Sequence, residues 1–521
     1  MSKIKFLSTL ILTYFMLFSF GQDFDLIWSS LNDKQSKKER LGQVDYMMSE
    51  DGYHYFVIFN GTRKKPVYSL FKLDDKMNVV SASPINFKIY GKNELAYNGS
   101  VALNGKMFVR TSYFNNSQDI NYGFISELSK DGVLSSDLTE LDAMKMEKKR
   151  SYGYFSFDVS EDQSKVMVSR ITPFVNKEQE NYALKVLDAD LKEIWSEEVR
   201  LPYSDRKFSI WDYNVDNDGN AYLGGRLYEG KNDTKTSSDD YAYKIFMHNS
   251  VSGEMKEYTV EIGDVYPTDM VFKFNDENLL VTGLYSDKET RSDAGVFHLE
   301  IDKVSSSVIS LAKKDFDQEL KDEYRSEKQI KKDKKSDKGV PDYEVREVFL
   351  TDSDERIMVA EQYDYYTTTH TYTTSNGNGG TSTRTVTTHH YVYGDILVTK
   401  FNKSGEVLWL TKIEKRQHTT NDGGYLSSYV SKLYDNGNKI EFFYAEMKSR
   451  KEAGTKKVDE RFVTKSVTVD AEGNQSEKPL FSIADEETIF RAKASVELDD
   501  KRTLILGERK MDFKFGLIEF K

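Results

Sequence analysis

Short segments in which apolar and polar residues alternate recur along most of the chain, separated by tight polar turns. This pattern predicts β-strands with one buried face. Well-marked segments run over 106–113, 165–171, 221–228, 279–285, 356–363 and 439–445. The turns before them are rich in Asp, Asn, Ser and Gly, which bond to their own backbone or tolerate positive φ. We expect these segments to be the second strand, b, of a repeating unit.

Two further strand types follow strand b in the same order. The c strands often begin with an aromatic residue and lead into a second tight turn; they run over 68–73, 122–128, 182–187, 396–401 and 463–469. The d strands include Trp195 and Trp409, and a similar segment near the N-terminus contains Trp28. Three of the four tryptophans therefore share one position of a repeat of about sixty residues.

The two ends of the chain have complementary sets of strands. The C-terminus supplies an a strand (491–498), a b strand (503–508) and a c strand (515–520), and the mature N-terminus supplies a lone d strand, 24–31. We expect these strands to form one shared sheet, because open sheet edges invite aggregation.

With seven internal repeats, this sharing predicts an all-β fold: a single β-propeller of eight four-stranded blades, closed by pairing of the N-terminal and C-terminal strands. Seven blades is an alternative, because the fifth d strand, 307–312, is weakly marked. Two β-sandwiches are another alternative, although that fold does not require complementary ends.

The first residues have the pattern of an export signal. Lys3 and Lys5 precede an apolar run over 6–20, and Gly21 follows this run. We expect residues 1–21 to be a cleaved signal peptide and 22–521 to be the propeller domain. The apolar run is short for the alternative, a membrane anchor, which needs about 20 residues. The predicted location is periplasmic or extracellular and associated with the cell surface, with no membrane insertion after cleavage.

The net charge and the cysteine content exclude some classes of partner and attachment. The net charge of −12 disfavours nucleic acid, because phosphates repel an acidic protein. The chain has no cysteine, so disulfides contribute nothing to its stability and no lipidated cysteine anchors it.

The long connections are concentrated in the b–c and d–a positions, which share one rim of a propeller. They cover 173–181, 229–239, 315–342, 366–390 and 448–459, whereas the a–b and c–d turns are short. Loops longer than about 12–15 residues are uncommon unless they are functional or disordered. We therefore expect a decorated face. The charged insertion at 315–342 is expected to hold a short helix or a solvated spur, and the basic one at 448–459 to meet an acidic partner or to be solvated.

The insertion at 366–390 carries the candidate binding site. Threonine-rich alternation on both sides of residues 376–380 predicts a protruding β-hairpin with His370 opposite about Val386. Its aromatic and polar side chains can stack on or hydrogen-bond to a glycan or a peptide, and a flexible ribbon without a ligand is the alternative. The candidate binding residues are Tyr366, His370, Tyr372, Arg384, His389, His390 and Tyr391.

Two segments resemble parts of bacterial β-propeller proteins. The run Asp216-Asn-Asp-Gly-Asn-Ala-Tyr-Leu-Gly-Gly225 resembles the turn-and-strand of bacterial β-propeller repeat proteins, and Asn278–Gly283 is a weaker copy. The segment from Tyr391 through Trp409 to Gln417 is similar to uncharacterised exported propeller proteins of the Bacteroidetes. This resemblance implies a fold and a compartment, and no activity.

Catalytic signatures are missing from the sequence. It contains no His-Glu-x-x-His, no Gly-x-Ser-x-Gly and no phosphate-binding glycine loop. Asp216, Asp218 and Asn220 begin like a calcium loop, but Ala221 stands where the glycine belongs. We therefore predict no catalytic residue, metal or cofactor, and a non-enzymatic binding or scaffold propeller of the cell envelope, with a protein or glycan partner at the decorated face. The alternative is a hydrolase or lyase acting on glycan, with paired carboxylates at the channel mouth.

Overall fold

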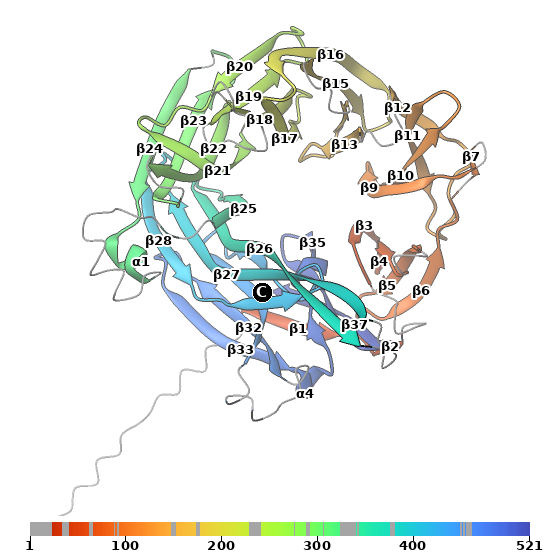
Figure 1. The fold of residues 1–521 in the computed structure, drawn as a ribbon, viewed down its shortest axis with the longest axis vertical. Coiled ribbons are helices and arrows are strands. Elements are labelled where there is room, and N and C mark those ends of the chain that lie inside the picture. Colours follow the sequence, from red (N-terminus) through yellow and green to blue (C-terminus); the bar gives the residue numbers. More distant parts are fainter. Residues whose placement is uncertain are drawn as a thin grey trace, which may run out of the picture.

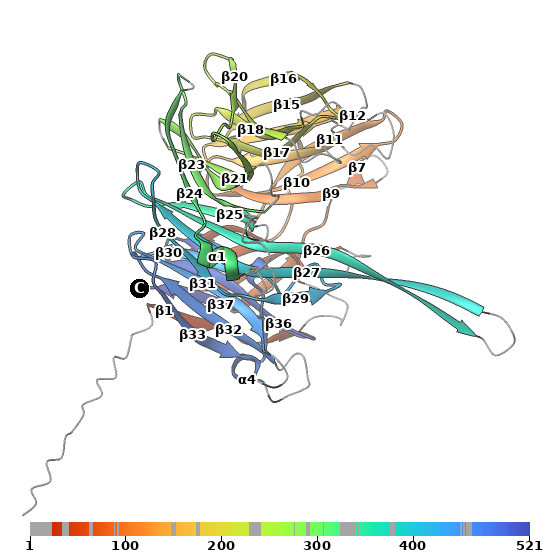
Figure 2. The same ribbon diagram turned by 60° about the vertical axis from the view of Figure 1, so that its left-hand side comes forward.

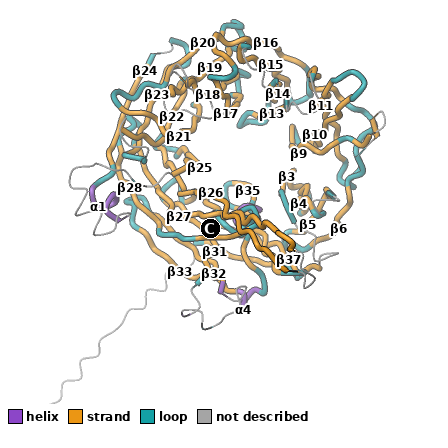
Figure 3. The backbone as a smooth tube through the Cα atoms, viewed as in Figure 1, coloured by secondary structure: helices purple, strands orange, loops and turns teal. Residues whose placement is uncertain are grey.

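In a computed structural model, the chain forms eight antiparallel β-sheets arranged in a ring, consistent with an eight-blade β-propeller (Figures 1 and 3). We number these sheets as blades 1 to 8 and name the strands of each a to d from the inside outwards. The structure describes residues 23–33, 41–61, 66–87, 89–90, 93–146, 153–172, 178–228, 241–275, 277–287, 292–305, 307–323, 340, 343–375, 381–448, 451, 454 and 461–521. The predicted signal peptide lies outside these residues, as does most of the 448–459 insertion.

Blades 1 to 4 each contain four consecutive strands. Blade 1 contains β3 (Val44–Glu50), β4 (Tyr53–Phe59), β5 (Tyr68–Asp74) and β6 (Val79–Pro84); blade 2 contains β9 (Ala96–Leu103), β10 (Lys106–Asn115), β11 (Ile120–Leu128) and β12 (Thr139–Lys145); blade 3 contains β13 (Tyr154–Val159), β14 (Lys165–Ile171), β15 (Gln179–Asp188) and β16 (Glu193–Ser204); blade 4 contains β17 (Phe208–Val215), β18 (Ala221–Tyr228), β19 (Tyr241–His248) and β20 (Met255–Thr259). A small separate hairpin is formed by β7 (Ile89–Tyr90) and β8 (Asn93–Glu94).

Blades 5 to 8 follow the same order with additions. Blade 5 contains β21 (Val265–Phe274), β22 (Asn278–Asp287), β23 (Gly295–Asp302) and β24 (Val308–Asp315); blade 6 contains β25 (Tyr343–Leu350), β26 (Arg356–Ser375), β27 (Thr381–Phe401), β28 (Val407–Ile413) and the short β29 (Gln417–Thr420); blade 7 contains β30 (Val430–Tyr434), β31 (Lys439–Met447), β32 (Phe462–Val469) and β33 (Gln475–Ser482). Because β24 is a regular outer strand, the seven-blade alternative is wrong. The short helices are α1 (Gln318–Glu323) and α4 (Ile483–Glu486).

Blade 8 combines the two ends of the chain. It contains β34 (Ile489–Phe490), β35 (Val496–Asp499), β36 (Arg502–Arg509), β37 (Asp512–Phe520), β1 (Phe24–Trp28) and β2 (Asn32–Asp33). The outermost strand, β1, pairs antiparallel with β37, with Phe24 opposite Phe520 and Trp28 opposite Gly516. The Trp28 ring also lies 4.7 Å from the ammonium of Lys514.

The inner strand expected over 491–498 is corrected by the structure. A 3-10 turn at Ala492–Ala494 separates β34 from β35. Arg491, immediately before this turn, is buried and donates to the backbone carbonyl of Leu41 and to Glu508 at 3.1 Å. Its side chain therefore ties blade 8 to the segment that enters blade 1.

Apolar side chains fill the spaces between neighbouring blades. Tyr222 and Ile245 of blade 4 pack with Leu279 and Phe297 of blade 5, and similar clusters join other blade pairs, including blades 8 and 1. Burial of one face of each strand explains the alternation seen in the sequence. Within the described part of the chain, no helix is both long enough and apolar enough to span a bilayer.

In the polar a–b turn of blade 4, the acidic side chain of Asp216 accepts hydrogen bonds from its own turn and the strand that follows. Asp216 Oδ1 accepts the backbone N–H groups of Asp218 (3.1 Å) and Asn220 (2.9 Å), and its Oδ2 accepts the Tyr222 hydroxyl at 2.9 Å. The calcium-like spacing in this segment therefore serves a side-chain-capped turn.

Candidate functional site: a β-arm and its buried anchor

Strands b and c of blade 6 continue beyond the ring as a long two-stranded ribbon (Figure 2). We call residues 365–375 and 381–391 the arm. The register runs from Tyr365 opposite Tyr391 to Ser375 opposite Thr381. His370 lies opposite Val386, so the expected hairpin register is confirmed.

Strand alternation gives the arm two faces of different chemistry. One, the tyrosine face, carries five of the seven candidate residues: Tyr366, His370, Tyr372, Arg384 and His390. Tyr372 is 56% exposed and Tyr366 is 41% exposed. Large aromatic side chains exposed together on a ribbon are typical of a contact surface.

The opposite face, the threonine face, is a ladder of hydroxyl groups along most of its length, and its ring end also carries Tyr365, which is 46% exposed. Thr369 lies opposite Thr387 and Thr371 opposite Thr385, with Oγ1–Oγ1 distances of 3.4 Å in both pairs. The remaining candidates, His389 and Tyr391, lie at the ring end of this face. The candidates thus do not form a single cluster, because neighbouring residues on a strand point to opposite sides.

Ring contacts order the base of the tyrosine face. Tyr366 stacks on His390 with centroids 4.4 Å apart and an interplanar angle of 7°. His390 Nδ1 lies 3.0 Å from His418 Nε2, and His390 Nε2 lies 2.8 Å from Thr368 Oγ1. On the other face, the Tyr365 hydroxyl lies 2.6 Å from His389 Nδ1. These contacts fix the first aromatic side chains of the arm.

Sequence reasoning missed His418, which arrives on the added strand β29. This strand pairs with β27, with Thr420 opposite His390 and His418 opposite Val392. The only available signal was the Gln-His-Thr-Thr run that follows strand d and resembles the arm in composition.

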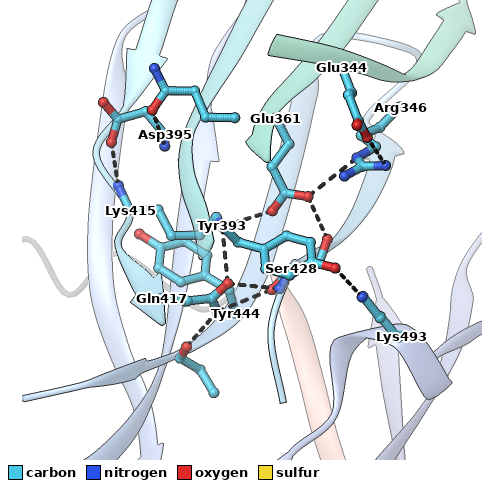
Figure 4. Close-up of polar contacts among 12 residues, drawn as sticks. Glu344, Arg346, Glu361, Tyr393, Asp395, Lys415, Gln417, Ser428, Tyr444 and Lys493 are labelled. Carbon is cyan, nitrogen blue, oxygen red and sulfur yellow. Dashed lines mark hydrogen bonds and ion pairs between the residues drawn. The ribbon is translucent and has the colours of Figure 1, made fainter. Parts of the chain in front are cut away.

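Beneath the arm base lies a buried polar network, which we call the anchor (Figure 4). Lys415 Nζ donates to Glu361 Oε1 at 2.8 Å and to Gln417 Oε1 at 3.0 Å, and the side chains of Lys415 and Glu361 are both 0% exposed. Ser428 Oγ donates to the other Glu361 oxygen at 2.8 Å. Gln417 Nε2 donates to the backbone carbonyl of Ala445 in blade 7 at 2.6 Å.

The anchor connects the arm-bearing strands with blade 7. Glu361 is on β26 just before the arm begins, Gln417 is on β29, and Ala445 is on β31. Burial lowers the pKa of Lys415, although Glu361 opposes this shift. A satisfied buried network rigidifies its surroundings, so the anchor fixes the direction in which the arm leaves the ring.

Tyr393 borders the anchor where β27 enters the ring (Figure 4). Its hydroxyl accepts a hydrogen bond from Lys493, and its ring lies 4.9 Å from that of Tyr363. Burial raises the pKa of Tyr393 and lowers that of Lys493.

A separate set of carboxylates ties the inner strands of neighbouring blades. Asp158 accepts the backbone N–H of Val215 at 2.8 Å, and Asp269 accepts that of Val345 at 2.7 Å. Burial raises the pKa of Asp158 to about 6, and the nearby carboxylate of Asp212 adds to the shift. Sequence reasoning missed this set, since nothing distinguished these residues among 85 carboxylates.

No group of three or more His, Asp or Glu side chains could hold a metal ion within the residues that the structure describes. The arrangement around the arm offers stacking surfaces and hydrogen-bonding groups.

No protein-family model and no curated protein sequence matches the chain. Solved structures of β-propeller proteins are similar at low sequence identity. The β-propeller domain of the Trilobed protease from Pyrococcus furiosus is 12% identical, with a TM-score of 0.32 over 74% of this chain and 94% of that one. Alpha-L-arabinanase from Penicillium chrysogenum is 9% identical, with a TM-score of 0.32 over 75% of this chain and 97% of that one. Prolyl oligopeptidase B from Galerina marginata is 9% identical, with a TM-score of 0.40 over 92% of this chain. The matched region is only 56% of the length of that protein.

Proposed function

We propose that the protein is an exported, non-catalytic binding or scaffold propeller of the cell envelope, which holds a partner protein along the tyrosine face of the arm. The observation that carries this proposal is the placement of Tyr366, Tyr372 and Arg384 on one face of an anchored ribbon. Tyr and Arg are enriched among the residues that dominate binding energy at interfaces.

The anchor supports the same proposal. A two-stranded ribbon is marginally stable alone, yet this one continues two central strands of blade 6 and rests on the buried Lys415–Glu361 pair. A ribbon held in one direction loses less entropy on binding than a flexible loop does.

Recovery of partners from cell envelopes tests the proposal. The triple variant Tyr366→Ala, Tyr372→Ala, Arg384→Ala should lose cross-linked partner protein that the wild type retains. The matched control Thr369→Ala, Thr371→Ala, Thr385→Ala changes the opposite face of the same ribbon and should retain it. Removal of residues 367–388 should leave the ring folded and abolish recovery. Equal recovery by all proteins contradicts the proposal.

A glycan-acting hydrolase is the second candidate, favoured by the electrostatic coupling of two neighbouring carboxyl groups, Asp158 and Asp212, whose pKa values are both raised by burial. Glycosidases pair a protonated carboxyl group with an ionised one. Release of reducing sugar from envelope polysaccharides by the wild type, lost in Asp158→Asn, would support this candidate. Absence of release by the wild type would reject it.

We also propose that residues 1–21 are removed on export and that the β1–β37 pairing then closes the ring. Mass spectrometry of the protein recovered from the envelope should find Gln22 as the first residue. A retained leader contradicts this part of the proposal.

A further inference from the structure

One long edge of the arm has no neighbouring strand. β25 pairs with β26 only as far as Gln362, and β27 pairs with the other side of β26 up to Ser375. Among the residues that the structure describes, no strand pairs with the free side of β26 over 365–375, which we call the β26 edge. On the other side of the ribbon, β29 already occupies the edge of β27 from His390 to Tyr393. We infer that two copies of the chain pair antiparallel along the β26 edge and form a dimer through their arms.

Backbone groups point outwards from the β26 edge at every second residue. On β27, the N–H of His389 donates to Asn421 Oδ1 at 3.0 Å and its carbonyl accepts the N–H of Asn421 at 2.9 Å, so both groups point away from β26. Opposite residues of an antiparallel pair either both face each other or both face outwards. Thr367 lies opposite His389, and the register continues without a shift to Ser375. The outward groups on the β26 edge therefore include those of Thr367, Thr369, Thr371 and Thr373.

The protein guards the outer strands of its blades but not the β26 edge. Charged residues and prolines on free edges prevent pairing with another chain. Every outer strand of the eight blades carries at least one: Pro84 on β6, Asp142 on β12, Pro202 on β16, Lys256 on β20, Lys313 on β24, Lys412 on β28, Pro479 on β33 and Asp25 on β1. Residues 365–375 contain no Asp, Glu, Lys, Arg or Pro, and most are Thr or Tyr, which favour strands. The β27 side of the arm, in contrast, carries Arg384.

A two-fold axis at Thr371 gives a favourable register for the dimer. Thr371 of each copy then faces Thr371 of the other, and their outward N–H and C=O groups form two hydrogen bonds. His370 lies opposite Tyr372 of the second copy, at a pair without backbone hydrogen bonds, where side chains are closest. Both side chains are exposed in the single chain. Aromatic cross-strand pairs stabilise a sheet, and no like charges meet along this edge.

The dimer is compatible with the shape and the charge of the protein. The arm extends well clear of the ring, which leaves room for a second copy (Figure 2). Thr371 is eight residues from Tyr363 at the arm base, so each ring begins about 27 Å from the axis. The net charge of −12 therefore lies mostly beyond the screening length of about 8 Å. The axis is perpendicular to the ribbon, so both tyrosine faces lie on the same side of the four-stranded sheet and remain accessible.

Sedimentation velocity of the purified mature chain, from about 1 to about 100 µM, tests the inference. We expect a reversible dimer, and a monomer after removal of residues 367–388. Thr371→Pro removes the central outward N–H from both copies, and proline is tolerated where an edge N–H faces solvent. This variant should weaken dimerisation at least about ten-fold. Thr385→Pro is the matched control, because Thr385 is the register partner of Thr371 on the other edge; it should leave the dimer unchanged.

A pair of charge variants tests the register and decides the question if proline disturbs the arm. Thr371→Lys alone or Thr371→Glu alone places like charges opposite each other and should weaken dimerisation about five-fold, whereas an equimolar mixture of the two should restore it. The inference is overturned if the wild type is monomeric at about 100 µM or if the dimer survives removal of residues 367–388. It is also overturned if Thr385→Pro acts as strongly as Thr371→Pro, or if the mixture associates no more strongly than either variant alone. The purified chain contains no partner protein, so the dimer stands or falls independently of the proposed arm function.

Discussion

Tyr366 stacks on His390 across the base of the arm, with centroids 4.4 Å apart and planes within 7° of each other. The two residues are register partners on β26 and β27. The same imidazole lies 3.0 Å from His418 on β29. A side chain that is already ordered before binding loses less entropy when a partner arrives, so this contact prepares the tyrosine face.

The first prediction concerns this ordering. Removing the imidazole with His390→Ala should loosen the arm base and leave the ring unchanged, because the stack is worth about 0.5–1.5 kcal/mol and lies outside the core. Hydrogen exchange measured by mass spectrometry should become faster in peptides covering 363–372 and remain unchanged in blades 1 to 4. Unchanged exchange in the arm peptides would show that the stack orders nothing.

The second prediction concerns the anchor. Lys415→Met should lower the free energy of unfolding by up to about 3–5 kcal/mol, because the buried carboxylate of Glu361 then keeps only Arg346, 3.4 Å away, as a cation. Lys403→Met removes the cation of an exposed pair with Asp354 and should cost at most about 1 kcal/mol. Urea unfolding compares the two variants, and an equal loss would contradict the special role of the buried pair.

The third prediction is a pH dependence that arises from Asp158. Burial raises its pKa from the ordinary value of 3.8 to about 6, so the folded state holds the proton more tightly than the unfolded state in this window. The contribution of Asp158 to the free energy of unfolding should therefore fall as the pH rises from about 4 to about 6, by at most about 3 kcal/mol, and level off above.

Asp158→Asn should remove this contribution. Its amide oxygen still accepts the N–H of Val215. The difference in stability between variant and wild type, measured by urea unfolding, should move in favour of the variant between pH 4 and pH 7. A constant difference would show that burial does not raise the pKa of Asp158.

The fourth prediction tests the contribution of the N-terminal strand. Phe24 is fully buried, and its ring lies 5.1 Å from that of Phe443 and 5.6 Å from that of Phe520. Phe24→Ala should cost about 3–5 kcal/mol. Leu31→Ala, in the same segment but 45% exposed, should cost less than about 0.5 kcal/mol. Urea unfolding compares these variants with the wild type. Similar unfolding midpoints for Phe24→Ala and the wild type would mean that β1 contributes little to the fold.

Local patterns were sufficient to predict most strands. The strands expected over 165–171 and 221–228 match β14 and β18, because alternation and turn residues mark both ends. The arm register followed from the central Asn-Gly run. In contrast, Glu361 and Lys415 are charged and therefore suggest solvent exposure, and only the folded ring brings them together. The 3-10 turn at Ala492–Ala494 likewise depends on a contact of Arg491 with a segment 450 residues away.

Site-specific photo-cross-linking tests the central claim most directly. A benzoylphenylalanine in place of Tyr372 lies on the tyrosine face, and the same group in place of the adjacent Thr371 points to the threonine face. In intact envelopes, we predict a discrete cross-linked protein from position 372 and none, or far less, from position 371. Equal yields from both positions, or a product from position 371 alone, would contradict the assignment of binding to the tyrosine face.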